Sequence, residues 1–276
     1  MHPDIIDIGP ITIHSYGLML ALAFVAGVWF FKRRAAIERI PIDSLFNVAY
    51  FLIIGGVVGA RIAFVLLHWT DFQDNLFDAF NPFQSGQFGI SGLNLYGGVL
   101  AAIGGACIYI FMKRLPLLAI FDLFAPTLGL GLAISRIGCF LNGCCFGTPT
   151  ELPWGVTFPT GSIPEYFYGS QPIHPTQLYS SLYGLILFFL LWYILKKKTF
   201  DGQVLAVLFV LESLFRFIIE PLRYYEVEMT LPIFGMEATY NQLVAVSLFI
   251  IGIIIYLAAP RNLHRNDTPE SNEPAL

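Results

Sequence analysis

The chain alternates between long runs of apolar residues and shorter polar stretches. The apolar runs are residues 15–31, 46–69, 96–112, 115–141, 175–195, 204–219 and 242–259. Each has about 16 to 27 residues, and a helix needs roughly 20 to cross the hydrocarbon core of a bilayer. A membrane-spanning strand needs only about 9–11 residues, so runs of this length indicate helices. The pattern predicts an all-α polytopic membrane protein with seven transmembrane helices.

The composition supports this interpretation. Hydrophobic residues make up 56% of the chain and charged residues only 12%, and the mean hydropathy is +0.69. An ordinary soluble domain has about 25% charged residues, and a soluble fold of this size could not hide so much apolar surface. These values exclude a disordered chain, a nucleic-acid-binding protein with a basic face, and a disulfide-stapled secreted scaffold.

Basic residues indicate which ends of the runs face the cytoplasm. Clusters occur at 32–39, 113–114, 196–198 and 261–265. All four fall on one side if the seven runs cross the membrane alternately, and Lys and Arg accumulate on the cytoplasmic side. This arrangement predicts an N-terminus outside and a C-terminus in the cytoplasm.

Two outer loops are too apolar to be plain connectors. Residues 70–94 contain several Phe and no Lys or Arg, and residues 142–174 are rich in Pro, Gly and aromatic residues. We expect these loops to form a small extracytoplasmic head at the level of the lipid headgroups. Residues 1–260 then make a single seven-span transmembrane domain, and the polar residues 261–276 make a disordered cytoplasmic tail.

Three arginines lie inside apolar runs, where a charged residue is costly and usually functional. They are Arg61, Arg136 and Arg216. At about 1.5 Å per residue along a helix, all three lie in the outward half of the membrane. We expect them to converge on one cavity open to the outer leaflet. Because a forked guanidinium suits phosphate, the residues predict binding of an anionic phospholipid without showing whether chemistry follows.

Charged residues also form a stripe on the sixth run. Glu212, Arg216, Glu220 and Arg223 are spaced so that they share one face of a helix. We expect the carboxylates to hold Arg216 in place and to lower the cost of burying it. A purely structural ion-pair stripe between helices is the alternative interpretation.

Six segments of the chain resemble one known family. The motif SRIGCFLNGCCFG (135–147) resembles the signature of bacterial prolipoprotein diacylglyceryl transferases. The other segments are HSYGLML (14–20), GARIAFVL (59–66), LNLYGGVL (93–100), HPTQLY (174–179) and FRFIIEPLR (215–223). Their order along the chain makes the resemblance specific, and it agrees with seven spans.

The resemblance implies a reaction and a place in the cell. Members of the family move the diacylglyceryl group of phosphatidylglycerol to the lipobox cysteine thiol of a prolipoprotein signal peptide, the first step of lipoprotein maturation. A thioether forms and glycerol phosphate is released. The resemblance implies a multi-pass protein of the bacterial cytoplasmic (inner) membrane with its active site facing the outer leaflet. Its partners would be phosphatidylglycerol, prolipoprotein signal peptides and membrane lipids, with no nucleic acid and no cofactor.

The resemblance also assigns roles to residues of this chain. Arg136 would bind the phosphate as a catalytic residue, and Arg216, held by Glu220, would be the second essential arginine. Two arginines can neutralise the charge that builds on the leaving phosphate. The remaining candidates for substrate binding are Tyr16, Arg61, Asn142, Gly147, Glu220 and His174.

One departure from the family pattern concerns the base for the thiol. The family often has His at the position of Tyr96. Tyrosine has an ordinary pKa of about 10 and is a poor base when neutral. We expect Tyr96 to be a catalytic residue that donates a hydrogen bond to phosphate. The base would then lie elsewhere, with His174 and His14 as candidates, although either histidine also suits a purely structural role.

The cysteines are a second departure. Cys139 and Cys144 stand where the family commonly has Asn and Glu, and Cys145 follows directly. The C-x4-C-C spacing matches no common zinc pattern and contains no His, so the sequence predicts no metal site. A disulfide within the trio stays open because the compartment outside the membrane is oxidising. Alternatively, the cysteines are small, polarizable side chains that fill space in a tight loop.

Three other functions compete with that of a lipid-to-protein transferase. A transporter or flippase for anionic phospholipids would need charged residues through the whole membrane thickness, whereas here they concentrate in the outer half. A receptor or light-driven rhodopsin-like protein has little support, because residues 242–259 contain no Lys to hold a retinal Schiff base. A family paralogue with a different thiol acceptor stays open, since the cysteines depart from the family pattern.

Overall fold

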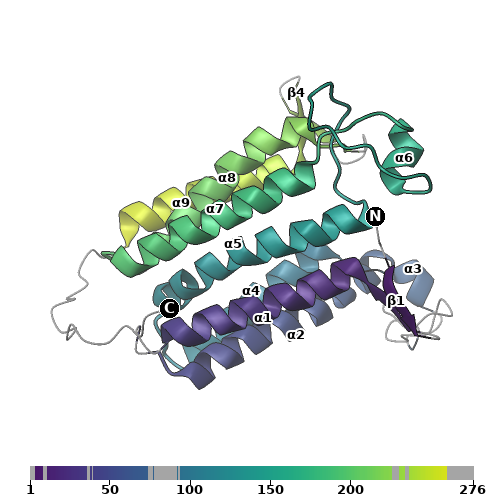
Figure 1. Ribbon diagram of the computed structural model, residues 1–276. Helices are drawn as coiled ribbons and strands as arrows, with labels where there is room; N and C mark the ends of the chain where they lie inside the picture. The colour runs from purple at the N-terminus through teal and green to yellow at the C-terminus, as the bar shows by residue number, and fades with distance from the viewer. Residues whose placement is uncertain are drawn as a thin grey trace.

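The computed structural model is a bundle of long helices with two β-hairpins at one end (Figure 1). The structure describes residues 4–8, 11–35, 38, 40–73, 77, 92, 94–225, 230–233 and 236–259. The predicted tail, residues 261–276, lies outside the described residues, as does most of the predicted loop 70–94.

Each predicted apolar run contains one long helix. The long helices are α1 Ser15–Ala35, α2 Ile42–Leu67, α4 Leu95–Met112, α5 Leu117–Asn142, α7 Thr176–Lys197, α8 Gln203–Ile219 and α9 Tyr240–Ala258. Five of them, α1, α2, α5, α7 and α9, are long and apolar enough to cross a membrane. Helix α4 is apolar but shorter, and α8 has 17 residues and carries Glu212 and Arg216. These helices fit a polytopic membrane protein.

The all-α prediction was incomplete, because the structure contains short strands as well. Strand β1 Asp4–Ile8 pairs antiparallel with β2 Ile11–His14, and β3 Thr230–Ile233 pairs antiparallel with β4 Met236–Thr239. The other short elements are α3 Trp69–Phe72, α6 Ile163–Tyr168 and the 3-10 helix η2 Glu220–Leu222. The strands have only four or five residues each, too short to register among apolar runs of membrane length.

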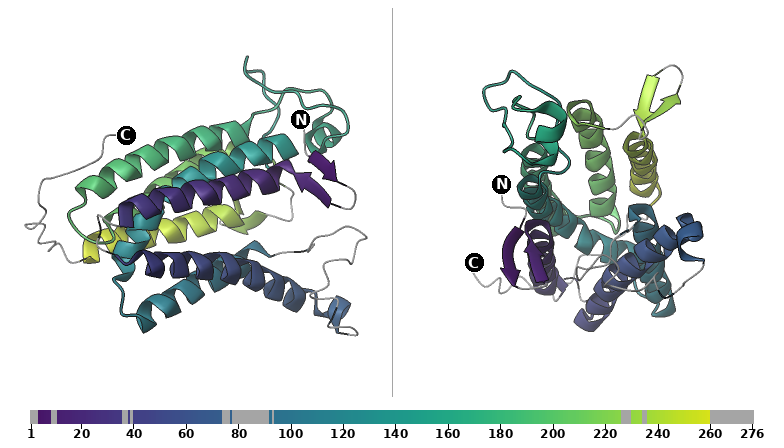
Figure 2. Two further views of the ribbon diagram at one scale, coloured as in Figure 1. Left: turned by 60° about the horizontal axis from the view of Figure 1, so that its bottom comes forward. Right: turned by 90° about the vertical axis from the view of Figure 1, so that its right-hand side faces the viewer.

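The two ends of the bundle differ in character. Successive long helices run in opposite directions, and both hairpins, α3 and α6 lie at one end, here called the head end (Figures 1 and 2). The basic residues 32–34 and 196–197 end α1 and α7 at the opposite end, here called the basic end. The hairpins and short helices therefore lie at one end of the bundle, and the basic residues that end α1 and α7 lie at the other (Figure 1).

Helix α5 is the central element of the bundle and packs against α1, α7 and α8. The first turn of α1 lies close to α5 at Gly138, where a Cβ would lie 3.2 Å from the Cα of Tyr16. Glycine at this position allows α1 to approach the last turns of α5. The approach brings Tyr16 beside the end of the segment that carries Arg136.

Helices α2 and α4 form a pair that stands apart from the layer of α1, α5 and α7 (Figure 2). Many apolar side chains on the outer surfaces of the helices are exposed, including Leu100 on α4, Leu182 on α7 and Ile250 on α9. Such a surface is expensive in water, whereas it suits the hydrocarbon core of a bilayer.

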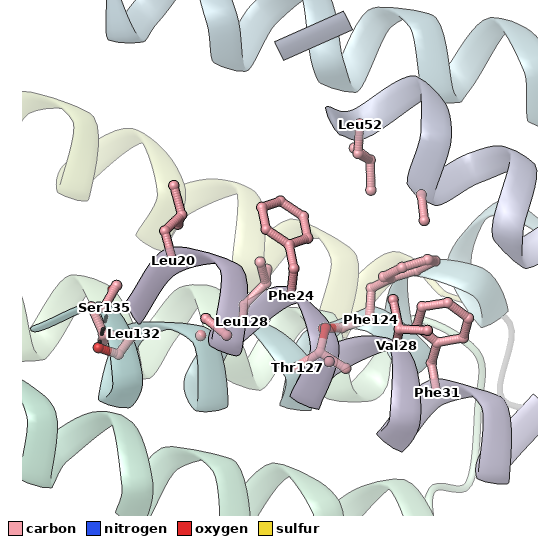
Figure 3. Close-up of a pocket in the computed structure, with 14 residues that line it drawn as sticks. Leu20, Phe24, Val28, Phe31, Leu52, Phe124, Thr127, Leu128, Leu132 and Ser135 are labelled. Atoms are coloured by element: carbon pink, nitrogen blue, oxygen red, sulfur yellow. Dashed lines mark hydrogen bonds between the residues drawn. The ribbon is translucent and has the colours of Figure 1, made fainter. Parts of the chain in front are cut away.

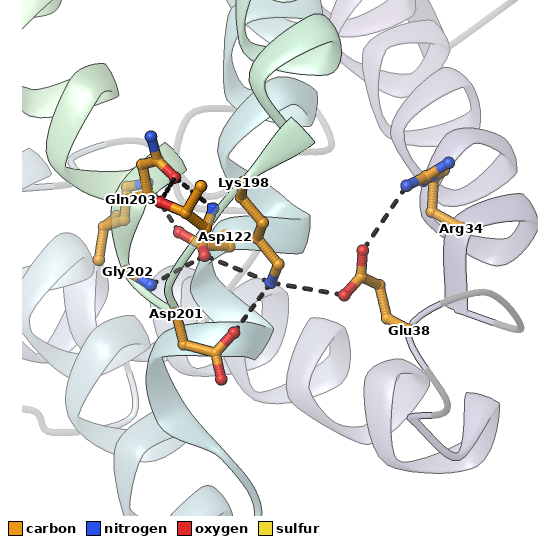
Figure 4. Close-up of polar contacts among 9 residues, drawn as sticks. Arg34, Glu38, Asp122, Lys198, Asp201, Gly202 and Gln203 are labelled. Carbon is orange, nitrogen blue, oxygen red and sulfur yellow. Dashed lines mark hydrogen bonds and ion pairs between the residues drawn. The ribbon is translucent and has the colours of Figure 1, made fainter. Parts of the chain in front are cut away.

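A buried ionic cluster joins three helices at the basic end (Figure 4). Asp122 of α5 is completely buried and accepts hydrogen bonds from the backbone nitrogens of Gly202 at 2.8 Å and Leu205 at 2.9 Å. The ammonium group of Lys198 lies 3.4 Å from Asp122 Oδ2 and 3.4 Å from Glu38 Oε2. Asp122 thereby caps the first turn of α8, and the cluster fixes how α5, α7 and α8 meet.

Candidate active site

The loop that follows α5 is held in one conformation by its own turn and by α7. Gly143 ends α5 in the left-handed region at φ 77°, and Cys145 has φ 58°. The Gln177 side-chain amide donates to the Cys144 carbonyl oxygen, and the Thr176 hydroxyl donates to the Cys145 carbonyl oxygen, both at 2.9 Å. The start of α7 therefore fixes the backbone of this loop relative to α5.

Three chain segments meet at Gly147. Its backbone nitrogen donates to the His174 carbonyl oxygen at 3.1 Å, and Thr148 donates to the Leu222 carbonyl oxygen at 3.0 Å. A Cβ at Gly147 would lie 2.5 Å from the His174 oxygen and 2.7 Å from the Leu222 oxygen. Glycine is therefore required at position 147, because the backbone there packs directly against His174, just before α7, and against Leu222 of the segment that follows α8.

Two of the predicted arginines are linked through one carboxylate. Arg216 Nε lies 3.3 Å from Glu212 Oε1, one turn earlier on α8. Glu212 also interacts electrostatically with Arg136 of α5. The side chains of Arg216 and Glu212 are 24% and 21% exposed, so they remain accessible. Guanidinium groups from two separate helices therefore share one anionic partner.

A third arginine and a cysteine extend this cluster. Arg136 makes a side-chain hydrogen bond with the thiol of Cys145. The Cys145 pKa is lowered by side-chain hydrogen bonds with Cys139 and Cys144 and by the positive charges of Arg136 and Arg223. Burial opposes this effect but does not reverse it. The loop is therefore strongly cationic around Cys145, which suits an anion.

The neighbouring polar residues mostly lie where the sequence predicted them. Tyr16, in the first turn of α1, lies within electrostatic range of Arg136 and of the three cysteines of the loop. The Asn142 side chain makes a hydrogen bond with Cys144. His174 Nδ1 lies 3.4 Å from the Tyr179 hydroxyl oxygen. Tyr16 and Asn142 thus adjoin the arginine cluster.

The structure pairs Arg216 with Glu212, one of the two carboxylates that the spacing offered, and not with Glu220, the one that the resemblance implies. Glu220 is 4% exposed, begins η2 and accepts a short hydrogen bond from the Thr239 hydroxyl. Glu220 directly follows α8 and keeps a helical backbone, with its N–H donating to the Arg216 carbonyl oxygen, but its carboxylate is engaged by the Thr239 hydroxyl. Glu212, still within α8, is the carboxylate that pairs with Arg216.

Arg61 and Tyr96 lie on the α2–α4 pair rather than on α5 or α8. Arg61 is 4% exposed, donates from Nη1 to the Gly92 carbonyl oxygen at 3.1 Å and lies 5.3 Å from the centre of the Phe72 ring. Tyr96 begins α4 and is 50% exposed. The structure thus links Arg136 and Arg216 through Glu212 and adds Arg223 as a further cation acting on Cys145, whereas Arg61 lies on a different pair of helices.

An apolar cavity runs along α5 between Phe124 and Ser135 (Figure 3). It has a volume of about 460 Å³ and lies between α1, α2 and α5. Its lining includes Phe124 and Leu128 in the middle of α5 and Ser135 directly before Arg136. Phe24 of α1 and Leu52 of α2 close it from the other sides. The cavity is therefore an apolar space along α5 whose lining reaches Ser135.

Sequence reasoning missed the side chains that position the loop. Thr176 and Gln177 belong to the motif HPTQLY, but the motif gave no reason to connect them with the carbonyl groups of Cys144 and Cys145. Both side chains are about 1% exposed. The signal available in the sequence was a Gln within an otherwise apolar run, because an amide that becomes buried needs hydrogen-bond partners.

Comparisons with known proteins identify the family of the chain. The sequence model of the family described as prolipoprotein diacylglyceryl transferase matches residues 3–258. Three relatives are named phosphatidylglycerol–prolipoprotein diacylglyceryl transferase. That of Finegoldia magna is 30% identical over 93% of this chain and 95% of its own length. That of Nitratidesulfovibrio vulgaris is 33% identical over 91% and 92%, and that of Campylobacter hominis is 31% identical over 94% and 91%.

Proposed function

The chain belongs to the prolipoprotein diacylglyceryl transferase family, and from that premise we propose that it transfers the diacylglyceryl group of phosphatidylglycerol to the lipobox cysteine of a prolipoprotein signal peptide. The acceptor sulfur attacks the glyceryl carbon that carries the phosphate, and the carbon–oxygen bond to the phosphate breaks. A thioether forms, the thiol proton leaves to a base, and glycerol phosphate departs. The observation that carries this proposal is the link between Arg136 and Arg216 through Glu212.

The arginines supply the electrostatic part of the reaction. Arg136, Arg216 and Arg223 bring three positive charges to one end of the bundle, and Glu212 offsets only one of them. A phosphate ester gains negative charge as it leaves, so preorganised guanidinium groups stabilise the transition state more than the ground state. The positive charge of these arginines also stabilises the thiolate form of the acceptor cysteine. Tyr16 and Asn142 border this region and complete the polar wall.

The apolar cavity gives the donor lipid a place for its hydrocarbon. Its lining is built mostly of apolar side chains such as Phe24 and Leu128, and it reaches Ser135, the neighbour of Arg136 in the sequence. An acyl chain that lies along α5 would therefore leave its headgroup at the arginines. No step of this reaction requires a metal, and no cofactor is expected.

The remaining predicted roles are part of the same proposal. Tyr96 acts as a hydrogen-bond donor to phosphate, and Arg61 binds substrate from the α2–α4 side. His174 takes the thiol proton, and its contact with the Tyr179 hydroxyl would orient its ring. Gly147 serves the site by its tight packing rather than by touching the lipid.

The proposed setting is the bacterial inner membrane. All seven long helices cross it within a single domain, residues 1–260, with the N-terminus outside and the basic end in the cytoplasm. The head end, with its hairpins and residues 142–174, then lies at the outer leaflet, where phosphatidylglycerol and translocated signal peptides meet. Basic residues at the ends of α1 and α7 support this orientation.

One reconstitution experiment tests the reaction. Purified protein is incubated with phosphatidylglycerol and a lipobox-cysteine peptide, and the peptide is analysed by mass spectrometry. We expect a diacylglyceryl adduct from the wild type, and its loss in Arg136→Ala and Arg216→Ala. Arg33→Ala is the matched control, because Arg33 packs over the Trp29 ring at the basic end. Absence of the adduct from folded wild-type protein would support a paralogue with another thiol acceptor.

A second experiment tests the acyl-chain cavity. Gly131 lines the cavity, and a Cβ there would meet nothing within 4 Å. Gly131→Leu should therefore fill the cavity without a backbone clash. We expect a raised KM for long-chain phosphatidylglycerol and little change for a short-chain analogue. Gly104→Leu on α4 is the control, since a Cβ at Gly104 is equally free. Equal effects on both donors would remove the cavity from the donor site.

A further inference from the structure

Three sulfur atoms converge at the end of α5. The Sγ atoms of Cys139, Cys144 and Cys145 all lie within 4.8 Å of one another. Cys139 is buried in the last turn of α5, and the other two are partly buried in the loop after it. The spacing C-x4-C-C alone predicts no metal site. The left-handed turn at Gly143 folds the chain back so that the three thiols face one point.

The separation of the sulfurs suits a single thiophilic ion. A zinc–thiolate bond is about 2.3 Å long, so three sulfurs around one ion lie roughly 3.8–4.0 Å apart. An equilateral triangle with 4.8 Å sides has its centre about 2.8 Å from each corner. Each sulfur would thus move inward by at most about 0.5 Å to reach bonding distance, which is within the range of a small rotation about χ1.

The backbone that carries the sulfurs is already fixed. The Cys144 backbone nitrogen donates to the Cys139 carbonyl oxygen at 3.1 Å. The carbonyl groups of Cys144 and Cys145 are both held by buried side chains of α7, Gln177 and Thr176. A ligand set whose backbone is fixed before binding loses little conformational entropy when an ion arrives.

The surrounding charge also suits a bound ion. Three thiolates around a divalent cation carry a net charge of −1, and around a monovalent cation −2. Arg136 and Arg223 both act on Cys145 with positive charge. The anionic complex would therefore have its counter-charges in place, which lowers the cost of holding it at the end of a transmembrane helix.

We propose that Cys139, Cys144 and Cys145 form a three-sulfur binding site for a soft, thiophilic metal ion, Zn²⁺ or Cu⁺. Thiolate ligands select these ions over hard cations such as Mg²⁺ or Ca²⁺. Zn²⁺ would take a fourth ligand to complete a tetrahedron, with water or the nearby Tyr16 hydroxyl as the donor, whereas Cu⁺ is satisfied by three sulfurs. Binding to three thiols releases up to three protons. The site adjoins the arginine cluster, but the proposed transferase chemistry itself uses no metal.

The test measures metal binding to the full-length, detergent-purified protein kept reduced. Cd²⁺, Zn²⁺ and Cu⁺ are added separately, and bound metal is counted after removal of free ions. We expect one ion per chain and, for Cd²⁺, an ultraviolet thiolate-to-metal charge-transfer band. X-ray absorption then separates the two ions by their coordination number.

Cysteine variants supply the controls. Cys139→Ser, Cys144→Ser and Cys145→Ser should each weaken binding by more than about tenfold, the loss expected even for an outer-shell change. Cys107→Ser is the matched control, because Cys107 lies within α4, on the α2–α4 pair. It should bind like the wild type. A raised thermal unfolding temperature of wild-type protein with metal gives a readout that does not depend on the variants.

Two results would overturn the proposal. One is wild-type protein that binds no soft metal or binds it equally well after all three cysteines are replaced. The other is protein isolated without reductant in which mass spectrometry of alkylated thiols finds a disulfide within the trio and no associated metal. Neither result depends on transferase activity, so failure of this site and failure of the proposed function are distinguishable.

Discussion

Gly147→Ala should damage both folding and transfer, although it adds only one methyl group. The new Cβ would lie 2.5 Å from the His174 carbonyl oxygen and 2.7 Å from the Leu222 carbonyl oxygen. Ordinary contact begins near 3.4 Å, so the overlaps are 0.9 Å and 0.7 Å. Both obstructing atoms belong to the backbone, and no side-chain rotation can relieve the overlap. The segments themselves must separate.

The separation puts three hydrogen bonds at risk. They are Gly147 N to His174 O at 3.1 Å, Thr148 N to Leu222 O at 3.0 Å, and His174 N to Thr148 O at 2.9 Å. Each contributes about 1 kcal/mol net, so we expect a loss of up to about 3 kcal/mol in the free energy of unfolding. A shift of nearly 1 Å in the loop beside Arg136 should also lower turnover by about 10²-fold.

The assay combines thermal unfolding in detergent with the adduct assay on phosphatidylglycerol and a lipobox peptide. Gly104→Ala is the matched control, because a Cβ at Gly104 of α4 meets nothing within 4 Å. The control should unfold and turn over like the wild type. A Gly147→Ala protein with wild-type unfolding temperature and turnover would refute the steric argument for the loop.

Three further predictions concern charge. Arg136→Lys keeps the positive charge but loses the forked guanidinium, so turnover should fall by about 10²–10³-fold while the unfolding temperature stays unchanged; an active variant would contradict forked binding. Glu212→Gln removes the carboxylate that holds Arg216 and should lower turnover, whereas Glu220→Gln should chiefly lower the unfolding temperature; the reverse pattern would restore Glu220 as the partner. Burial lowers the pKa of Lys198, but the neighbouring carboxylates, Asp122 with the largest effect, outweigh it and raise the pKa above its ordinary value of 10.5. This stabilisation is present below pH 10.5 and is lost as the pH rises through the raised value, so Lys198→Met should reduce the alkaline fall in unfolding temperature.

The sequence was most informative where a single helix is enough to define the feature. The length of each apolar run predicted a long helix, because hydrocarbon thickness sets how many apolar residues a span needs. The arginines inside the runs indicated a functional site, because a charged side chain within an apolar membrane helix is costly and is usually functional. The resemblance of residues 135–147 then gave a family that the comparisons confirm.

These patterns did not predict which residues of different segments contact each other. The spacing of Glu212, Arg216 and Glu220 did not show which carboxylate pairs with the arginine: Glu212 does, whereas Glu220 accepts a hydrogen bond from Thr239. The short strands were likewise hidden, because four or five residues of alternating character do not stand out beside runs of membrane length.

Only the tertiary structure decided which side chains meet at the end of α5. The cysteines at 139, 144 and 145 follow no familiar ligand spacing, yet the turn at Gly143 brings their sulfurs within 4.8 Å. Gln177 and Thr176 hold that turn from a helix more than thirty residues away. The apolar runs along the chain show which residues prefer an apolar environment, and their lengths were enough to predict the helices. The contacts between helices depend on where each helix stops and how closely its neighbour can approach, which are properties of the packed chain as a whole.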